Sequence, residues 1–295
     1  MKKIAIIGGI HGNELTGIKL IQTWRNNPAV VARGNCEIHL EYGNPPAIKE
    51  KVRFINEDLN RLFHIDDLNC PPKPSWESRR AHELNELLGP KFDRPQVDVI
   101  IDLHTTTSNM GNTLIIYDKP YNLKLAKYIQ NHEPGVRVYI SDKDIKDTMA
   151  LQSVAPHGML LEIGPIPQGV LYHQQFEDMQ RITQHALDFI HAFDNSPTYD
   201  VTGTLEVYQR GTLIPYPTNN SGDIGAMLHK DIQNQDYRLL TRGDPIFMTF
   251  DGETITYNGE AGFPVFINEA AYYEKNIAFR MNNKMTLSIP ARVSD

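Results

Sequence analysis

Apolar residues follow two alternating patterns along the first two thirds of the chain. Continuous apolar runs, typical of strands buried on both faces, alternate with segments in which apolar residues recur every three or four positions, as in helices that pack by one face. The runs cover residues 4–10, 97–104, 113–117, 136–140 and 159–163. Residues 37–42 also read as a strand, and the helical segments begin near residues 14, 75, 123 and 172. This alternation predicts an α/β fold, in which a mostly parallel mixed sheet is flanked by helices on both faces.

The pattern changes near residues 194–197, which read Asp-Asn-Ser-Pro. Beyond them, short β-rich runs are separated by Gly and Pro, at residues 204–208, 212–216, 246–250, 254–257 and 263–267. Short strands with turn signals between them are typical of a mainly β domain. We therefore expect two domains, an α/β domain over residues 1–196 and a smaller β-rich C-terminal domain over residues 197–295.

Composition and charge restrict the classes of function. The 295 residues are 40% hydrophobic and 22% charged, as in an ordinary globular protein. The net charge of −7 disfavours nucleic acid as a partner, because phosphate contacts require an excess of Lys and Arg. Cys36 and Cys70 form no Cys-x-x-Cys pair, so we expect no disulfide framework and a reducing, cytoplasmic location. No segment approaches the ~18 apolar residues of a membrane span, so no membrane association is expected.

Candidate metal ligands stand at the ends of two apolar runs. His11 and Glu14 follow the first run, and His104 ends the run at residues 97–104. In an open α/β sheet, ligands bind outside the carboxyl ends of the strands. Two imidazoles and one carboxylate at that edge are the ligand chemistry of a catalytic zinc with one open position. The leading interpretation is a zinc hydrolase.

Plainer interpretations exist for the same residues. The segment Gly8-Gly9-Ile10-His11-Gly12 could be a glycine-rich turn for phosphate, but it lacks the G-x-G-x-x-G spacing of a dinucleotide site. His104 could be a core histidine with a satisfied hydrogen bond. Asp102 precedes it by two residues, on the same face of the strand, and is a candidate acceptor for a ligand imidazole.

Candidate catalytic and binding residues lie in the run at residues 159–163 and in a polar loop. Glu162 places a carboxylate in an apolar strand, where burial of a charge is costly. The carboxylate could be stabilised by an ion pair with an arginine. Alternatively, it could be a general base whose pKa is raised by apolar surroundings. Arg53 and the segment Asp58-Leu59-Asn60-Arg61 supply positive charge and amide donors. Most Arg side chains are solvated at the protein surface. The functional alternative is that these guanidinium groups bind a substrate carboxylate through two parallel hydrogen bonds or donate to an oxyanion.

Together these segments resemble the aspartoacylase/succinylglutamate desuccinylase family, specifically its aspartoacylase and aminoacylase-3 branch. The resemblance extends from residue 4 to about residue 280, nearly the whole chain. The matching segments are GGIHGNE (residues 8–14), DLNR (58–61), DLHTTTSNMG (102–111), GPIPQGVL (164–171) and PVFINEAAYYEK (264–275).

The resemblance implies a zinc-carboxypeptidase-like catalytic domain, with the β-rich C-terminal domain as a cap that narrows the entrance. It implies one Zn²⁺ per subunit and a homodimer or larger assembly. Glu269 would be a structural ion-pair member. The implied roles are His11, Glu14 and His104 as zinc ligands, Glu162 as catalytic base, Arg53 as partner of the carbonyl oxygen, and Asn60, Arg61 and Tyr272 as binders of the substrate carboxylate.

The implied reaction is hydrolysis of an N-acyl amino acid, by default N-acetyl-L-aspartate. Two positions depart from the aspartate-specific pattern: Gln152 stands where those relatives carry an Arg, ten residues before the catalytic Glu, and Thr105 stands where they tend to have Asn. A neutral amide cannot make a bidentate, charge-assisted pair, so the preference for aspartate is open. Lys143 or Lys146 could supply the missing charge.

Three alternatives follow from the same residues. One is a deacylase of neutral or aromatic N-acetyl amino acids or mercapturates, as in the aminoacylase-3 branch. A metallocarboxypeptidase would share the metal ligands, but a bulky cap over the entrance disfavours it. A non-catalytic metal-binding or nucleotide-binding protein is disfavoured by the candidate base and by the missing dinucleotide spacing.

Overall fold

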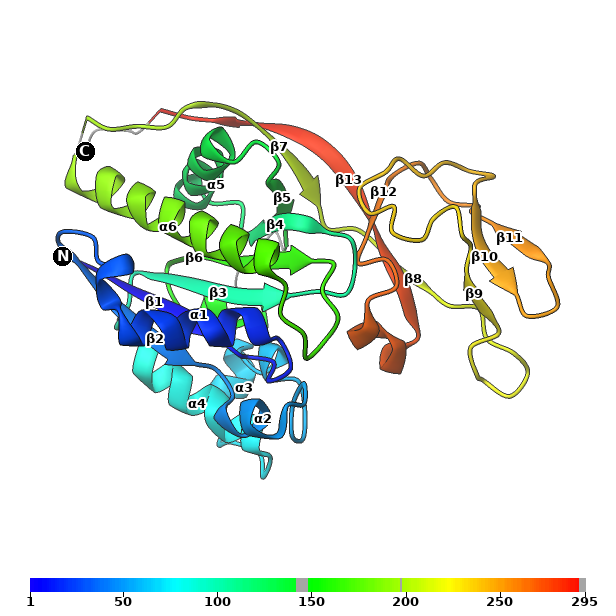
Figure 1. Cartoon of the computed structure of the whole chain (residues 1–295), viewed down its shortest axis with the longest axis horizontal. Coiled ribbons are helices and arrows are strands. Elements are labelled where there is room, and N and C mark those ends of the chain that lie inside the picture. Colours follow the sequence, from blue (N-terminus) through cyan, green and yellow to red (C-terminus); the bar gives the residue numbers. More distant parts are fainter. Residues whose placement is uncertain (142–147, 197, 292–295) are drawn as a thin grey trace.

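The computed structural model describes residues 1–141, 148–196 and 198–291. A 10-stranded sheet runs through the molecule in the order β12-β13-β7-β5-β4-β6-β3-β1-β2, with β8 paired to β13, and a separate 3-stranded sheet has the order β11-β10-β9 (Figure 1). The predicted positions Lys143 and Lys146 lie outside the described residues.

The half of the large sheet that comes first in the sequence is built from the predicted apolar runs. Neighbouring strands β2, β1, β3 and β6 are parallel, β4 is antiparallel to β6, and β5 is parallel to β4. The strands are β1 (Lys2–Gly8), β2 (Cys36–Tyr42), β3 (Val99–Thr105), β4 (Gly111–Ile116), β5 (Arg137–Ile140) and β6 (His157–Gly164). The mostly parallel mixed sheet predicted from the sequence is confirmed.

Each face of this sheet packs on its own hydrophobic core, which explains why its strands are apolar at consecutive positions. In β1, Ile4 and Ile6 belong to one core, whereas Ala5 and Ile7 belong to the other. The first core is shared with α1 (Leu15–Asn26), α5 (Pro120–His132) and α6 (His173–Asn195), and the second with α4 (Trp76–Leu88), beside which lie the short α2 (Pro45–Glu50) and α3 (Ile65–Asn69) (Figure 1). No helix in the described ranges is long and apolar enough to cross a membrane.

Short 3₁₀ helices carry several residues of the candidate site into place. Two of them, η2 (Leu59–Arg61) and η4 (Leu151–Ser153), lie in loops of the α/β region, and η5 (Ala270–Lys275) lies in the C-terminal region. Asp58 caps η2 by accepting a hydrogen bond from the Asn60 amide, and Glu269 caps η5 in the same way through the Ala271 amide. A further 3₁₀ helix, η1 (Pro28–Val30), follows α1.

The C-terminal region continues the large sheet before it forms the small one. Strand β7 (Gly203–Gln209) pairs with β5, and β13 (Ile277–Ile289) pairs with β7 through Asn283–Ile289 and with β8 and β12 through its first half. The remaining strands are β8 (Leu213–Pro215), β9 (Ala226–Leu228), β10 (Pro245–Thr249), β11 (Thr254–Thr256) and β12 (Phe263–Val265). The small sheet packs on a core that includes Tyr216, Phe247 and Phe279.

Strand β13 was not predicted from the sequence, and neither was β9. Positions Asn283 to Thr286 of β13 are exposed, so its middle is polar on both sides and lacks the alternation by which a strand is recognised. Tertiary pairing with β7 determines its conformation there, through seven consecutive residue pairs from Asn283 to Ile289.

Candidate metal and active site

The carboxyl ends of β1 and β3 bring the three predicted metal ligands together. His11 and Glu14 lie in the loop between β1 and α1, and His104 lies near the end of β3. The Glu14 carboxylate stands between the two imidazoles, with Oε1 2.6 Å from His11 Nδ1 and Oε2 3.0 Å from His104 Nδ1. All three side chains are buried, and their ligand atoms lie within 4.8 Å of one another.

The second nitrogen of each imidazole faces another carboxylate. His11 Nε2 lies 3.0 Å from Asp58 Oδ1, and His104 Nε2 lies 2.9 Å from Asp102 Oδ2. A histidine that binds a metal commonly donates its other ring N–H to a carboxylate, which fixes the ring and leaves one nitrogen to bind the metal. The donor set of two Nδ1 atoms and one carboxylate therefore fits a zinc ion with an open position.

Asp102 has the contact expected from the sequence, whereas the contact of Asp58 was not foreseen. The sequence analysis assigned Asp58 only to a polar segment with Asn60 and Arg61. No local pattern connects it to His11, from which it is 47 residues distant. Only the folding of that loop over the end of β1 brings the two side chains together.

Opposite charges in the cluster control its titration. Burial raises the pKa of Glu14, but the adjacent His11 and His104 outweigh burial and hold that pKa well below its usual range. Burial likewise lowers the pKa of His104, and the neighbouring Asp102 and Glu14 outweigh burial and raise it well above the usual range. The carboxylate of Glu14 is therefore ionised at neutral pH, as metal binding requires.

Glu162 lies next to the metal cluster on the neighbouring strand. It pairs with His104 in the β3–β6 register, and it is 8% exposed. Burial raises the pKa of its carboxyl to about 8, with further increases from Glu14 and Glu269 and opposing contributions from His104 and Arg53. A bound dication would lower the pKa of the Glu162 carboxyl. The pKa would then lie nearer to neutral pH, where a carboxyl can both accept a proton and return it.

Arg53 spans the two carboxylates on the His11 side of the cluster. Its Nη1 lies 3.3 Å from Glu14 Oε1 and its Nη2 3.2 Å from Asp58 Oδ2. Its backbone carbonyl accepts a hydrogen bond from the Gly12 amide, and a Cβ on Gly12 would lie 2.0 Å from the Ala47 carbonyl carbon. This turn therefore requires glycine next to His11, and the close approach holds Arg53 against the candidate ligands.

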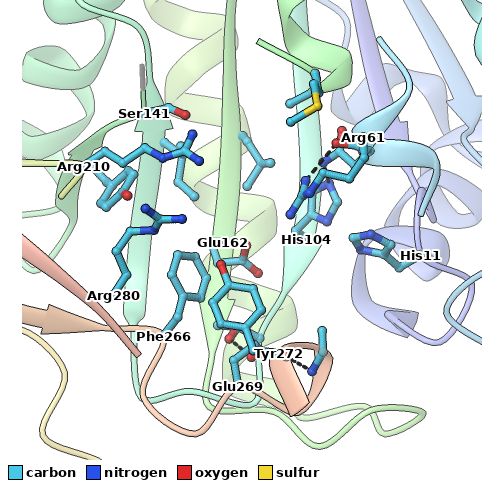
Figure 2. A pocket seen from close by; sticks show the side chains of 18 of the residues that line it. His11, Arg61, His104, Ser141, Glu162, Arg210, Phe266, Glu269, Tyr272 and Arg280 are labelled. Carbon is cyan, nitrogen blue, oxygen red and sulfur yellow. Dashed lines mark hydrogen bonds between the residues drawn. The ribbon is translucent and has the colours of Figure 1, made fainter. Parts of the chain in front are cut away.

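A cavity of about 420 Å³ opens onto the cluster. Figure 2 shows His11, His104 and Arg61 on one side of it, with Glu162 and Tyr272 between them and a second group of cationic side chains. All eight predicted site residues line this cavity: His11, Glu14, Arg53, Asn60, Arg61, His104, Glu162 and Tyr272.

Asn60, Arg61 and Tyr272 approach the cavity from different parts of the fold. Asn60 Oδ1 accepts a hydrogen bond of 2.9 Å from the Leu151 amide, and Arg61 donates from Nη1 to the Asn60 carbonyl at 2.8 Å. Tyr272 comes from η5 of the C-terminal region. Burial raises the pKa of Tyr272, so its hydroxyl stays protonated and can donate a hydrogen bond at neutral pH.

Glu269 joins the C-terminal region to the loop that follows β3. Its Oε2 accepts hydrogen bonds from the Thr107 amide at 2.9 Å, from the Thr107 hydroxyl at 3.0 Å, and from the Thr106 hydroxyl. The sequence analysis expected an ion pair here. The contacts of Glu269 with described residues are instead hydroxyl and amide donors, which place it as an anchor for η5 and so for Tyr272.

Gln152 and Thr105, the two departures from the aspartate-specific pattern, also line the cavity. Gln152 is 1% exposed, and its Oε1 has no hydrogen-bond partner within the described ranges. The Thr105 amide donates to Glu14 Oε2 at 3.1 Å, so this residue supports the cluster through its backbone. The cavity residues that the sequence analysis did not single out include Arg210 and Arg280, because no motif marks either position.

Comparison with known proteins is consistent across the chain. Residues 1–190 match the model of the succinylglutamate desuccinylase/aspartoacylase catalytic domain, and residues 203–284 match that of the AstE/AspA barrel-sandwich hybrid domain. The aspartoacylase of Rattus norvegicus is 40% identical over 98% of this chain and 94% of its own length. The N-acyl-aromatic-L-amino acid amidohydrolase (carboxylate-forming) B of Danio rerio is 41% identical over 98% of this chain and 95% of its own length.

A solved structure extends the comparison to the fold. The crystal structure of murine aminoacylase 3 superposes with a TM-score of 0.94 at 35% identity, covering 99% of this chain and 98% of that one. The resemblance inferred from the sequence motifs is thereby confirmed. The chain belongs to the succinylglutamate desuccinylase/aspartoacylase family.

Proposed function

We propose that this protein is a zinc-dependent amidohydrolase that cleaves the amide bond of N-acyl amino acids, with N-acetyl-L-aspartate as the default substrate. The observation that carries the proposal is the buried His11–Glu14–His104 cluster opening onto the same cavity as Glu162. The amidohydrolases among its relatives support the same reaction class.

His11, Glu14 and His104 would hold the zinc through the two Nδ1 atoms and the carboxylate. When bound, zinc supplies Lewis acidity toward a carbonyl oxygen and toward water. Asp58 and Asp102 keep both rings oriented through their contacts with the Nε2 atoms.

Glu162 and Arg53 would carry out the chemical steps. The Glu162 carboxylate removes a proton from water as the water oxygen attacks the acyl carbon, and it returns that proton to the departing nitrogen as the C–N bond breaks. Arg53, charged and aimed at the cluster, stabilises the negative charge that develops on the carbonyl oxygen. One water molecule is consumed, and the products are a carboxylate such as acetate and a free amino acid.

Substrate orientation would depend on Asn60, Arg61 and Tyr272. An amide, a guanidinium and a phenol hydroxyl supply donors that suit the α-carboxylate of an amino acid. Tyr272 comes from the proposed cap, residues 197–295, so the cap completes a site whose chemistry is supplied by the proposed catalytic domain, residues 1–196.

We also propose a cytoplasmic location and a homodimeric assembly. Cys36 and Cys70 are free thiols in the structure, which fits a reducing compartment. The dimer rests on the family resemblance alone, and sedimentation of the purified protein would test it.

The substitution Glu162→Gln tests the proposal. We expect acetate release from N-acetyl amino acids to fall by about 10²–10⁴-fold, the usual contribution of a general base, with zinc content unchanged at about one ion per subunit. Loss of zinc together with activity would make Glu162 a metal ligand instead of a base. Zinc-loaded wild-type protein that hydrolyses no N-acyl amino acid would indicate a non-catalytic metal-binding protein, and efficient dipeptide cleavage would indicate a carboxypeptidase.

A second candidate substrate class is favoured by one observation. Gln152 is buried in the cavity wall and carries no charge, which suits a neutral, aromatic or thioether side chain better than a carboxylate. Parallel assays of N-acetyl-L-aspartate, N-acetyl-L-tyrosine and an N-acetyl-cysteine conjugate distinguish the two classes.

A further inference from the structure

Two arginines line the part of the cavity that lies across Glu162 and Tyr272 from the histidines. Arg280 is on β13 and Arg210 directly follows β7. Figure 2 shows both guanidinium groups turned toward the cavity, on the side opposite His11 and His104. None of the catalytic roles proposed above uses either residue.

Tyr272 lies between these arginines and Arg61, which is another of the proposed α-carboxylate binders. Burial raises the pKa of its hydroxyl, and the positive charges of Arg61 and Arg280 both oppose that increase. In Figure 2, Arg61 and Arg280 stand on opposite sides of the Tyr272 ring. The cavity therefore has two separate cationic regions rather than one.

The backbone around Arg280 holds its side chain in place. Its Nη1 donates to the Gly211 carbonyl at 2.8 Å, and the Gly211 amide donates to Asn282 Oδ1 at 3.1 Å. A Cβ on Gly211 would lie 2.2 Å from the Met281 carbonyl oxygen, so only glycine permits this approach to β13. The remaining guanidinium donors of Arg280 have no carboxylate within 4.0 Å among residues 1–141, 148–196 and 198–291.

The cavity wall is mixed near the two guanidinium groups, where Figure 2 shows Phe266 beside Arg280 and Ser141 beside Arg210. The same cavity is also lined by the apolar side chains of Ile115, Leu160, Leu213 and Ile277. In partly apolar surroundings a guanidinium–carboxylate pair is stronger than in water, and the donors of Arg280 that do not bind Gly211 are available to a ligand carboxylate. The chain as a whole carries a net charge of −7, so this concentration of positive charge is local.

We propose that Arg280, with Arg210 beside it nearer the surface, forms a second anion subsite that binds the side-chain carboxylate of an acidic N-acyl amino acid. The inference rests on the proposed deacylase function and specifies its substrate class. Arg280 on β13 and Arg210 just after β7 supply the positive charge that Gln152 does not provide from η4. A substrate with two carboxylates would be held at both ends, with its acyl group directed toward the metal cluster.

The test compares each acidic substrate with its uncharged amide of nearly equal shape. We would measure kcat/KM of the zinc-loaded protein for N-acetyl-L-aspartate against N-acetyl-L-asparagine, and for N-acetyl-L-glutamate against N-acetyl-L-glutamine. At least one acid should exceed its amide by about tenfold or more, since a charge-assisted pair is stronger than a neutral hydrogen bond. Replacement Arg280→Gln should lower that acid-to-amide ratio by about tenfold, to near one, with the amide rate little changed.

Two further variants separate charge from fold. Arg280→Lys keeps the positive charge but loses the paired guanidinium donors, so it should retain part of the acid-to-amide ratio. Arg242→Gln removes one exposed positive charge from another part of the C-terminal region and should leave the ratio unchanged. If Arg280→Gln does not fold, Arg210→Gln, at an exposed position, should still lower the ratio by about threefold, in keeping with a partly screened charge.

The outcomes are distinguishable. A wild-type protein that hydrolyses amides or aromatic substrates as well as acids overturns the subsite but leaves the deacylase function intact. If Arg280→Gln lowers kcat/KM equally for the acid and for its amide, the subsite is also overturned, because an equal loss indicates a structural role for Arg280. Absence of hydrolysis with every N-acyl amino acid instead overturns the proposed function on which the subsite rests.

Discussion

The two walls of the cavity are built in different ways. On the metal side, His11, Glu14 and His104 are buried at the ends of parallel strands and are fixed by carboxylate–imidazole contacts. On the opposite side, Arg280 lies on β13 and is half-buried, and Arg210 follows the antiparallel neighbour β7 and is exposed. The groups proposed for bond cleavage are therefore coupled to one another by short contacts, and we expect changes in the groups proposed for substrate choice to leave those contacts intact.

Removing one proposed metal ligand should cause the largest loss of zinc binding and activity. A change outside the metal side of the cavity should not cause this loss. His104→Ala is expected to abolish zinc binding and activity together, because two remaining ligands do not make a stable zinc site. Tyr272→Phe, between the two walls, should leave zinc content unchanged and raise KM by about tenfold through loss of one hydrogen bond to a charged group. Metal analysis and steady-state kinetics on both variants check this. Zinc loss in Tyr272→Phe would show that the walls are not independent.

Asp58 and Asp102, the carboxylates that face the histidine Nε2 atoms, should affect zinc binding less than the proposed ligands do. Their effect should still exceed that of contacts from the C-terminal region. Asp58→Asn and Asp102→Asn each weaken the orientation of one imidazole and are expected to lower zinc affinity by about 10–100-fold. Competition with a chromogenic chelator measures this change. A matched effect at both positions is expected, since both face a histidine Nε2 at similar distance; an unchanged affinity in Asp58→Asn would remove it from the metal site.

The junction between the walls should be sensitive to Glu269. Glu269→Gln loses the charge that accepts hydrogen bonds from Thr106 and Thr107, and a cost of about 1.5–3 kcal/mol in stability is expected. Because Tyr272 lies on the helix that Glu269 caps, KM should rise while zinc affinity is retained. Chemical denaturation and kinetics test both statements, with Glu274→Gln, at an exposed position on the same helix, as the control.

The smallest effect concerns the pH dependence of the metal-free protein. Because the pKa of Glu162 is about 8 in the fold and 4.5 as a reference, the unfolded chain loses this proton first, and the group reduces stability as pH rises from about 4.5 to 8. Metal-free Glu162→Gln should therefore melt a few degrees above metal-free wild type at pH 8, with little difference at pH 4.5. Equal melting temperatures at pH 8 would contradict the raised pKa.

The sequence predicted one wall better than the other for a physical reason. His11 and Glu14 follow β1 and His104 lies near the end of β3, and both strands have consecutive apolar residues that are visible locally. Parallel strands bring their carboxyl ends to one edge of the sheet. The polar middle of β13 hides the strand that carries Arg280, and Arg210 follows a short strand with no motif. Tyr272 was expected only through family resemblance, because its position depends on contacts of Glu269 with residues about 160 positions away.

The chain of contacts from Asp58 through His11, Glu14 and His104 to Asp102 also governs how the metal enters. Because Asp102 and Glu14 raise the pKa of His104 well above its usual range, this imidazole is charged and carries a proton on Nδ1, 3.0 Å from Glu14 Oε2. A metal ion that binds to His104 Nδ1 must displace that proton, so loading is an exchange of one cation for another rather than simple addition. Acid therefore competes directly with the metal, and the fraction of loaded protein depends on pH even when the amount of metal in solution is constant.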